Sequence, residues 1–156
     1  MSAVIVSLRV AVSPEDAFDT FTEDIGLWWQ ASELFQITPR GDGTLSFDNR
    51  ERLITTLPNG NVFEIGRVRV WEPGRRLAFS WRQATFTPDQ LTHVEIMFEP
   101  VGAETRVTVT HRGWDEIPQD HVARHGFPLA ATQMRLAETW RGRLAAYAGR
   151  IGPARD

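Results

Sequence analysis

The stretch that decides the fold is FPLAATQMRLAETWRGRLAAYAGRI, from Phe127 to Ile151. At about 100° per residue, its apolar side chains gather on one face of a helix. That face carries Leu129, Gln133, Leu136, Ala137, Trp140, Leu144, Tyr147 and Ile151, and the opposite face or its margin carries Arg135, Glu138, Thr139, Gly142 and Arg143. A helix of roughly six or seven turns needs a broad apolar partner. Because most of the preceding chain has the pattern of strands, we expect that partner to be a β-sheet.

Length and composition indicate one globular domain over residues 1–156, with 42% hydrophobic residues to form its core. The formal charge is −3, with acidic and basic residues spread along the chain, so no basic stripe favours nucleic acid or an anionic membrane. All 17 basic residues are arginine, and cysteine is absent, which removes Schiff-base lysines, thiolate nucleophiles and disulfides. Without a signal-peptide pattern or a long apolar run, we expect a cytoplasmic protein that is not inserted in a membrane.

The N-terminal part predicts a strand followed by two short helices. Residues 4–12 alternate valine or leucine with other residues, the pattern of a strand with one buried face. In the next four residues, Ser13 is suited to cap a helix and Pro14 to occupy its first position. Gly26 is expected to bend the chain before Trp28 and Trp29, which gives two helices rather than one.

Residues 40–113 predict an antiparallel meander of about six strands, with turns at Asn59-Gly60, Pro73-Gly74 and Val101-Gly102-Ala103. The turns predict nine facing pairs: Leu57–Val62, Thr55–Glu64, Leu53–Gly66, Val70–Leu77, Val68–Phe79, Gly66–Trp81, Phe98–Thr105, Ile96–Val107 and Val94–Val109. In all three hairpins this register puts the larger apolar set on one face. The expected fold class is therefore α+β, with a curved antiparallel sheet wrapped around a long C-terminal helix.

Four segments together resemble a known superfamily. They are residues 4–17 with the run SPEDAF that begins at Ser13, LWW at 27–29, EIGRVRVWEPGRRLAFSW at 64–81 and VTVTHRGW at 107–114. In this order they resemble the START-like, Bet v 1-like (SRPBCC) superfamily, in the branch named after the activator of the heat-shock protein 90 ATPase. The resemblance implies the helix-grip fold and a cavity between sheet and long helix that takes a hydrophobic or aromatic small molecule. The superfamily also includes aromatase/cyclases and co-chaperone domains, and fold does not fix chemistry.

Polar residues on faces assigned to the interior are the candidate anchors of such a ligand. They are Glu64, His111 and Gln133, with Thr55 less clearly placed. A buried carboxylate without a partner costs several kcal/mol, so Glu64 must be paired, protonated, hydrated or near an opening. For each residue a purely structural hydrogen bond stays open as the alternative.

Apolar residues expected at the same place complete the predicted ligand-binding set: Trp29, Trp81, Ile96, Met134 and Trp140. Aromatic walls with a few polar groups are typical of small-molecule sites. The main hypothesis is a carrier or sensor of a hydrophobic small molecule, without a catalytic residue or cofactor. Two alternatives are an enzyme of cyclase, dehydratase or hydrolase type that uses His111 or Glu64 as acid or base, and a co-chaperone that binds a chaperone.

Two further patterns concern metals and partners. His121 and His125 are four residues apart, but no third ligand is evident and Val122 replaces the glutamate of a zinc-protease motif, so we expect no metal site. Under the predicted register, Ile54, Phe63 and Ile65 lie on the outer face. An exposed apolar cluster of this kind favours an interface, which predicts a homodimer through this edge.

Overall fold

The computed structural model describes residues 3–29, 43–82, 86–87, 90–121 and 124–151. The elements in chain order are β1 (Ala3–Val10), α1 (Pro14–Glu23), α2 (Ile25–Trp28), β2 (Thr44–Asp48), β3 (Arg52–Thr56), β4 (Val62–Glu72), β5 (Arg76–Trp81), β6 (Thr92–Val101), β7 (Glu104–Arg112), η1 (Trp114–Glu116) and α3 (Leu129–Ile151). The expected α+β fold, with two short helices after the first strand and a long C-terminal helix, is confirmed.

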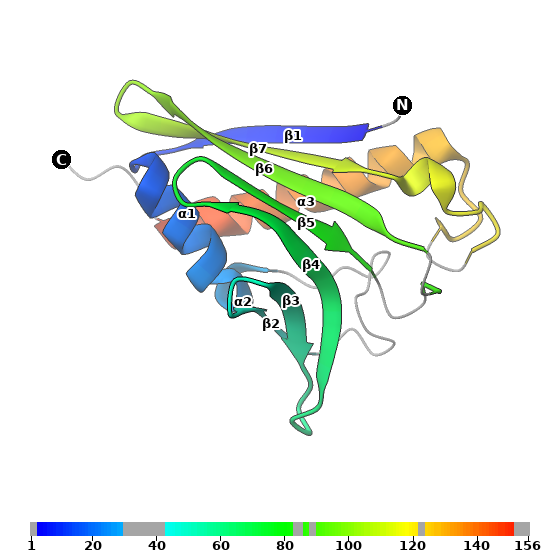
Figure 1. The fold of residues 1–156 in the computed structure, drawn as a ribbon. Helices are drawn as coiled ribbons and strands as arrows, with labels where there is room; N and C mark the ends of the chain where they lie inside the picture. Colours follow the sequence, from blue (N-terminus) through cyan, green and yellow to red (C-terminus); the bar gives the residue numbers. More distant parts are fainter. Residues whose placement is uncertain (1–2, 30–42, 83–85, 88–89, 122–123, 152–156) are drawn as a thin grey trace.

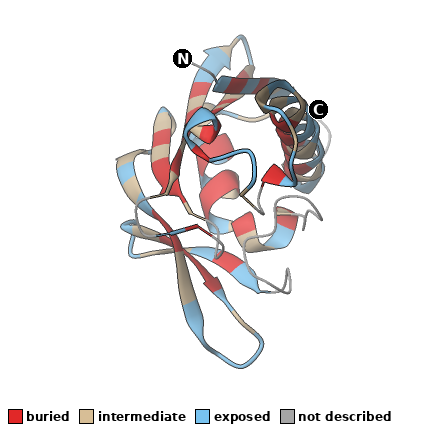
Figure 2. Cartoon of the chain, turned by 90° about the vertical axis from the view of Figure 1, so that its right-hand side faces the viewer, coloured by how far each residue is buried: buried red, intermediate tan, exposed pale blue. Residues whose placement is uncertain are grey.

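The strands form one seven-stranded sheet in the order β1-β7-β6-β5-β4-β3-β2. All neighbours are antiparallel, and β1 pairs with β7 through Val4 opposite His111. In Figure 1, α3 runs behind β6 and β7, while β4 curves away towards an arm that it forms with β2 and β3. Buried residues line the inner side of the sheet and the side of α3 that faces it (Figure 2). The core therefore lies between these two layers.

The helix α1 begins after Ser13, and Asp24 separates it from α2. Ser13 caps α1, since its hydroxyl accepts a hydrogen bond from the Asp16 amide at 3.2 Å. The chain breaks at Asp24, one turn before Trp28. Gly26 lies inside α2, where a Cβ would stand 2.7 Å from the carbonyl oxygen of Leu45. This glycine permits the close approach of α2 to β2 rather than a bend.

The predicted register is wrong by one residue in the hairpin of β3 and β4. Thr55 faces Phe63, and Glu64 faces Ile54. The Leu57 amide bonds the Asn61 carbonyl oxygen at 2.8 Å, so the turn is longer than the two residues expected. A β-bulge at Ile65 then adds a residue to β4 and restores the predicted pair of Leu53 with Gly66. Glu64 consequently lies on the outer face.

The same bulge overturns the expected exposed apolar cluster. Ile65 is fully buried at 0% exposure, Ile54 is 9% exposed, and Phe63 is half-buried. These residues belong to the packing of the β2–β4 arm, because the shift by one residue moves Phe63 and Ile65 to the inner face. The reason for the predicted homodimer is thereby removed.

The other two hairpins differ from the predicted register in ways that keep most faces. Val68 faces Phe79 as predicted, but a second bulge places Val70 opposite Ala78. Between β6 and β7 every pair is shifted by two, so that the facing pairs are Phe98–Val107, Ile96–Val109 and Val94–His111. A shift of two keeps each side chain on its face. The interior placement of His111 is therefore confirmed.

The long helix α3 begins at Leu129, two residues after the predicted start. Its buried residues include Leu136, Trp140, Leu144 and Tyr147, as the helical period predicted. The prediction for Arg143 is wrong, because this residue is buried with 3% exposure. A long arginine side chain on the margin of a helix reaches inwards along its aliphatic stem.

Candidate functional site

The interior end of the site is built on His111, near the end of β7. Val94 on β6 and Val4 on β1 flank His111 across the two ladders, which fixes its ring on the inner face. After β7, Gly113 adopts a φ of +103°, a conformation that side chains disfavour. The chain turns there into η1, which brings Trp114 back against the His111 ring with centroids 5.9 Å apart.

Three groups lie within hydrogen-bonding distance of the His111 imidazole. The indole Nε1–H of Trp140 donates to Nδ1 at 3.1 Å, and the indole Nε1 of Trp114 lies 3.2 Å from Nε2. The Thr92 hydroxyl lies 2.7 Å from Nε2 and donates to the Trp81 carbonyl oxygen at 3.3 Å. His111 is 2% exposed. The imidazole thus joins β5, β6, η1 and α3.

This arrangement selects the neutral imidazole. An indole only donates, and an imidazolium has no lone pair to accept. The Trp140 indole therefore opposes protonation of Nδ1, and the single proton of the neutral ring then lies on Nε2, which faces the Thr92 hydroxyl. Burial lowers the pKa of His111 to about 3, with smaller contributions from the charges of Arg143 and His93. At neutral pH the ring is an uncharged hydrogen-bond centre.

Arg143 is the polar group of this region that the sequence prediction missed. Its guanidinium carbon lies 4.1 Å from the centroid of the Trp29 ring and 5.3 Å from that of Trp140, a cation–π arrangement. Burial lowers the pKa of Arg143 to about 9, which leaves it charged at neutral pH. Its Nε and Nη2 atoms are buried and have no hydrogen-bond partner among the described residues. The spacing of three residues after Trp140 and four before Tyr147 was the available signal.

The predicted aromatic walls meet as expected. Trp29 stacks on Trp81 with centroids 5.3 Å apart and 29° between planes. It also meets Trp140 edge to face at 5.4 Å. Ile96 is fully buried in the same core. Trp29 is the wall residue that stays half-buried, so the cluster reaches the surface past its ring.

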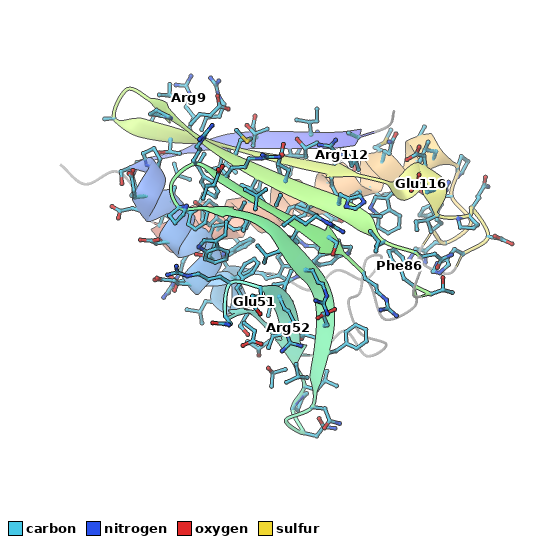
Figure 3. All side chains as sticks on the ribbon, in the orientation of Figure 1. Arg9, Glu51, Arg52, Phe86, Arg112 and Glu116 are labelled. Carbon is cyan, nitrogen blue, oxygen red and sulfur yellow. The ribbon has the colours of Figure 1, made fainter. Side chains whose placement is uncertain are left out.

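The other predicted site residues lie elsewhere or contribute less. Gln133 is half-buried on α3, and Met134 beside it is 64% exposed and points to solvent. Glu64 pairs with Arg67 at 3.5 Å and with Arg52 at 3.8 Å, and its side chain is 33% exposed. Figure 3 labels Arg52 on the arm formed by β2–β4. Glu64 is therefore an ion-paired residue of the outer face, not an interior anchor.

Thr55 does lie inside, as the less certain prediction had it. It is fully buried, and no residue that the structure describes forms a hydrogen bond with its Oγ1 atom. A Cβ on Gly43 would stand 2.2 Å from this oxygen. Thr55 therefore packs against the backbone that leads into β2, on the arm rather than at the His111 cluster.

Two clefts formed by described residues lie outside the cluster. One, of about 340 Å³, separates α1 from β2 and the turn after it, with Asp19, Glu23, Arg50 and Trp71 in its lining. The other, of about 350 Å³, lies at the end of β2 and β3 beside Pro58. Neither is lined by the predicted ligand-binding residues.

The sequence predicts neither a metal site nor a membrane-spanning helix. Within residues 3–29, 43–82, 86–87, 90–121 and 124–151, no three histidine, aspartate or glutamate side chains are placed to hold a metal ion. His121 packs on Phe86 at 5.5 Å, and His125 lies near Phe127 at 6.1 Å. In the same part of the chain, no helix is both long and apolar enough to cross a membrane.

The family of the chain follows from a match over most of its length. Residues 11–140 match the family described as Activator of Hsp90 ATPase homolog 1-like protein. The chain belongs to this family. The span begins just after β1 and ends at Trp140, and apart from residues 4–10 it includes the segments on which the resemblance was based. The resemblance to the SRPBCC superfamily is thereby confirmed, while no curated protein matches this Hsp90-ATPase-activator-like chain.

Solved structures share the fold of this Hsp90-ATPase-activator-like domain. Protein MLL2253 from Mesorhizobium loti has a TM-score of 0.61 at 17% identity, with 95% of each chain covered. The AHSA1 protein SPO3351 from Silicibacter pomeroyi has a TM-score of 0.59 at 17% identity, over 96% of this chain and 97% of the other. PFC0360w, an HSP90 activator from Plasmodium falciparum, has a TM-score of 0.63 at 18% identity, with 97% of each covered. These identities establish a common fold and no common activity.

Proposed function

We propose that this protein binds a hydrophobic or aromatic small molecule between α3 and the inner face of the sheet. The observation that carries the proposal is the make-up of this region. Three indole rings, those of Trp29, Trp81 and Trp140, surround only a few polar groups, chiefly His111 and Arg143. An apolar lining with few convergent polar groups is the usual design of a small-molecule site.

The proposed route to the interior passes Trp29. This ring follows α2, whose last residue is Trp28, and it is the most exposed member of the three walls. Because Trp29 contacts both Trp81 and Arg143, a ligand that displaces or stacks on it reaches all the proposed partners. Burial of the ligand would supply affinity of roughly 25 cal/mol per Å² of apolar surface, before ordering costs.

Tryptophan fluorescence gives the test. Titration with a library of lipids and aromatic compounds should produce a saturable change in emission, because three indoles line the proposed site. The Trp29→Phe variant should lose most of that change while it stays folded. Native mass spectrometry of protein purified from its own host should show a retained small molecule. No saturable response and no retained mass would contradict the proposal.

The enzymatic alternative has less support. A general acid or base works best with a pKa near the operating pH, whereas burial holds the pKa of His111 at about 3. Glu64, the other candidate, is ion-paired on the outer face. A product formed from any candidate substrate and lost in His111→Gln would revive this alternative.

The co-chaperone alternative rests on the name of the family and on the fold shared with the Plasmodium falciparum HSP90 activator. Fold-level likeness is a weak argument for a shared partner. Stimulation of a cognate chaperone ATPase by the purified chain would support it, and an unchanged ATPase rate at saturating concentration would dismiss it.

A further inference from the structure

Two arginines, Arg124 and Arg143, are buried in the part of the chain that the structure describes, and only Arg124 has a hydrogen-bond partner there at each of its three nitrogens. Arg124 is 5% exposed, and its three nitrogens bond Thr132 Oγ1, the Ile117 carbonyl oxygen and the Phe127 carbonyl oxygen at 3.1, 2.7 and 2.7 Å. Arg143 is 3% exposed and lacks partners at Nε and Nη2. Buried polar groups are almost always hydrogen-bonded. The difference marks Arg143 as a group whose partner is not supplied by the described part of the chain.

The two orphaned atoms of Arg143 form one binding edge. Nε and Nη2 lie side by side on the planar guanidinium, and their N–H bonds are parallel, the geometry that a carboxylate accepts with two oxygens. The Trp29 and Trp140 rings lie near the guanidinium at 4.1 and 5.3 Å. Aromatic contacts of this kind stabilise the cation without using its N–H groups.

The charge of Arg143 is also uncompensated. Among the residues that the structure describes, no ion pair includes Arg143. The pairs join other side chains, such as Arg76 with Glu95 and Arg150 with Asp24. His111 also lies in this part of the interior. It is uncharged at neutral pH, because its pKa is about 3. Beside Trp29 and Trp140 the interior therefore holds the positive charge of Arg143 and two N–H donors, at Nε and Nη2, that the described residues leave without an acceptor.

We propose that the Nε–Nη2 edge of Arg143 binds the carboxylate of a hydrophobic monocarboxylic acid whose apolar body lies against Trp29, Trp81 and Trp140. The inference rests on the proposed function and names the class of ligand. One cation balances one negative charge, so a carboxylate is favoured over a phosphate dianion, which would bury a second charge without a partner. The aromatic walls leave the apolar body free to be an aromatic ring or an alkyl chain.

Matched ligands test this assignment in the full chain. Isothermal titration calorimetry at neutral pH should compare 2-naphthoate with 2-naphthamide and 2-naphthyl phosphate, and decanoate with decanamide. We expect the acids to bind about tenfold or more tightly than the amides, since hydrogen bonds between two charged groups are stronger than those of a neutral amide. The phosphate should bind less tightly than 2-naphthoate.

Three variants locate the effect. Arg143→Met should abolish the preference for the acid while the amide still binds, and Arg143→Lys should keep only part of it, because an ammonium retains the charge and loses the fork. Arg141→Met, which removes an exposed arginine of the same helix, should leave the preference unchanged. Circular dichroism should show that each variant is folded, and Arg143→Lys carries the test if Arg143→Met does not fold.

The outcomes separate this inference from the proposed function. Equal binding of acid and amide by the unsubstituted chain would overturn the assignment of Arg143 and leave hydrophobic binding intact. A full acid preference in Arg143→Met, or tighter binding of the phosphate, would also overturn it. Absence of binding by all five probes and by the lipid and aromatic library would overturn the proposed function and this inference together.

Discussion

The indole Nε1–H of Trp140 donates a hydrogen bond to Nδ1 of His111 across 3.1 Å, and so joins the middle of α3 to the C-terminal end of β7. Both residues are buried, at 0% and 2% exposure. A hydrogen bond in such surroundings gains from the low local dielectric, and it is costly to leave unmade. The state of the His111 ring is therefore coupled to the packing of the long helix.

Acid should destabilise the fold through His111. Its pKa is about 3 in the folded state and 6.5 in the unfolded chain, so the unfolded chain binds the proton more readily. The contribution is complete above pH 6.5 and is lost as the pH falls towards 3, at about 1.4 kcal/mol per pH unit. Urea unfolding at several pH values should show this slope.

The control for that experiment separates His111 from the carboxylates that also titrate in acid. His111→Gln should be less stable at neutral pH and lose the part of the slope between pH 6.5 and 5, above most carboxylate titrations. His125→Asn, at an exposed position with a φ of +50°, should keep the full slope. An unchanged slope in His111→Gln would mean that other groups are responsible.

Close approach of two strands at Gly66 predicts a large loss of stability in Gly66→Ala. A Cβ at this position would stand 1.7 Å from the Ser80 carbonyl oxygen, a backbone atom that has no freedom to yield. We expect a loss of about 3 kcal/mol or more. Gly142→Ala, with open space around the helical glycine, should gain about 0.5–1 kcal/mol. Chemical denaturation measures both, and equal effects would contradict the steric argument.

The sequence predicted the faces of α3 and β7 because both follow a regular period. The helical and strand periods predict that Trp140 and His111 face the interior. The register between β6 and β7 differs from the predicted one by two residues, which leaves every side chain on the predicted face. The bulge at Ile65 could not be predicted from a regular period, because no particular residue type marks its position. One added residue moves the side chains of β4 before the bulge to the opposite face of the sheet. Glu64 and the expected dimer edge were misplaced for this reason.

Arg143 was misplaced for a different reason. Its position on the helix is marginal, and a charged residue type was taken as a sign of exposure. The structure turns its stem inwards between Trp29 and Trp140, a choice set by the aromatic partners of distant segments. The local sequence pattern carries no information on such tertiary contacts. The buried position of Arg143 could therefore not be predicted from it.

A buried phenol predicts a moderate loss in Tyr147→Phe. The hydroxyl of Tyr147 on α3 donates to the Ala17 carbonyl oxygen on α1 at 2.7 Å, and burial raises its pKa. Removal of this neutral hydrogen bond should cost about 1 kcal/mol, since the ring packing is kept. Thr139→Ala removes an exposed side-chain bond of the same helix and should change stability by less than about 0.5 kcal/mol. A neutral Tyr147→Phe would show that the helices are held by ring packing alone.

The two buried arginines predict opposite responses to the same substitution in the ligand-free protein. Arg143→Met replaces a buried charge that lacks two hydrogen-bond partners by an apolar side chain of similar length. It should stabilise the fold by about 1–2 kcal/mol, after loss of the cation–π contacts is counted. Arg124→Met strips the donors from three acceptors and should destabilise by about 2–4 kcal/mol. Thermal and urea unfolding measure both signs. Destabilisation by Arg143→Met comparable to that of Arg124→Met would mean that Arg143 has a structural partner within the chain, and the vacant edge would no longer point to a ligand.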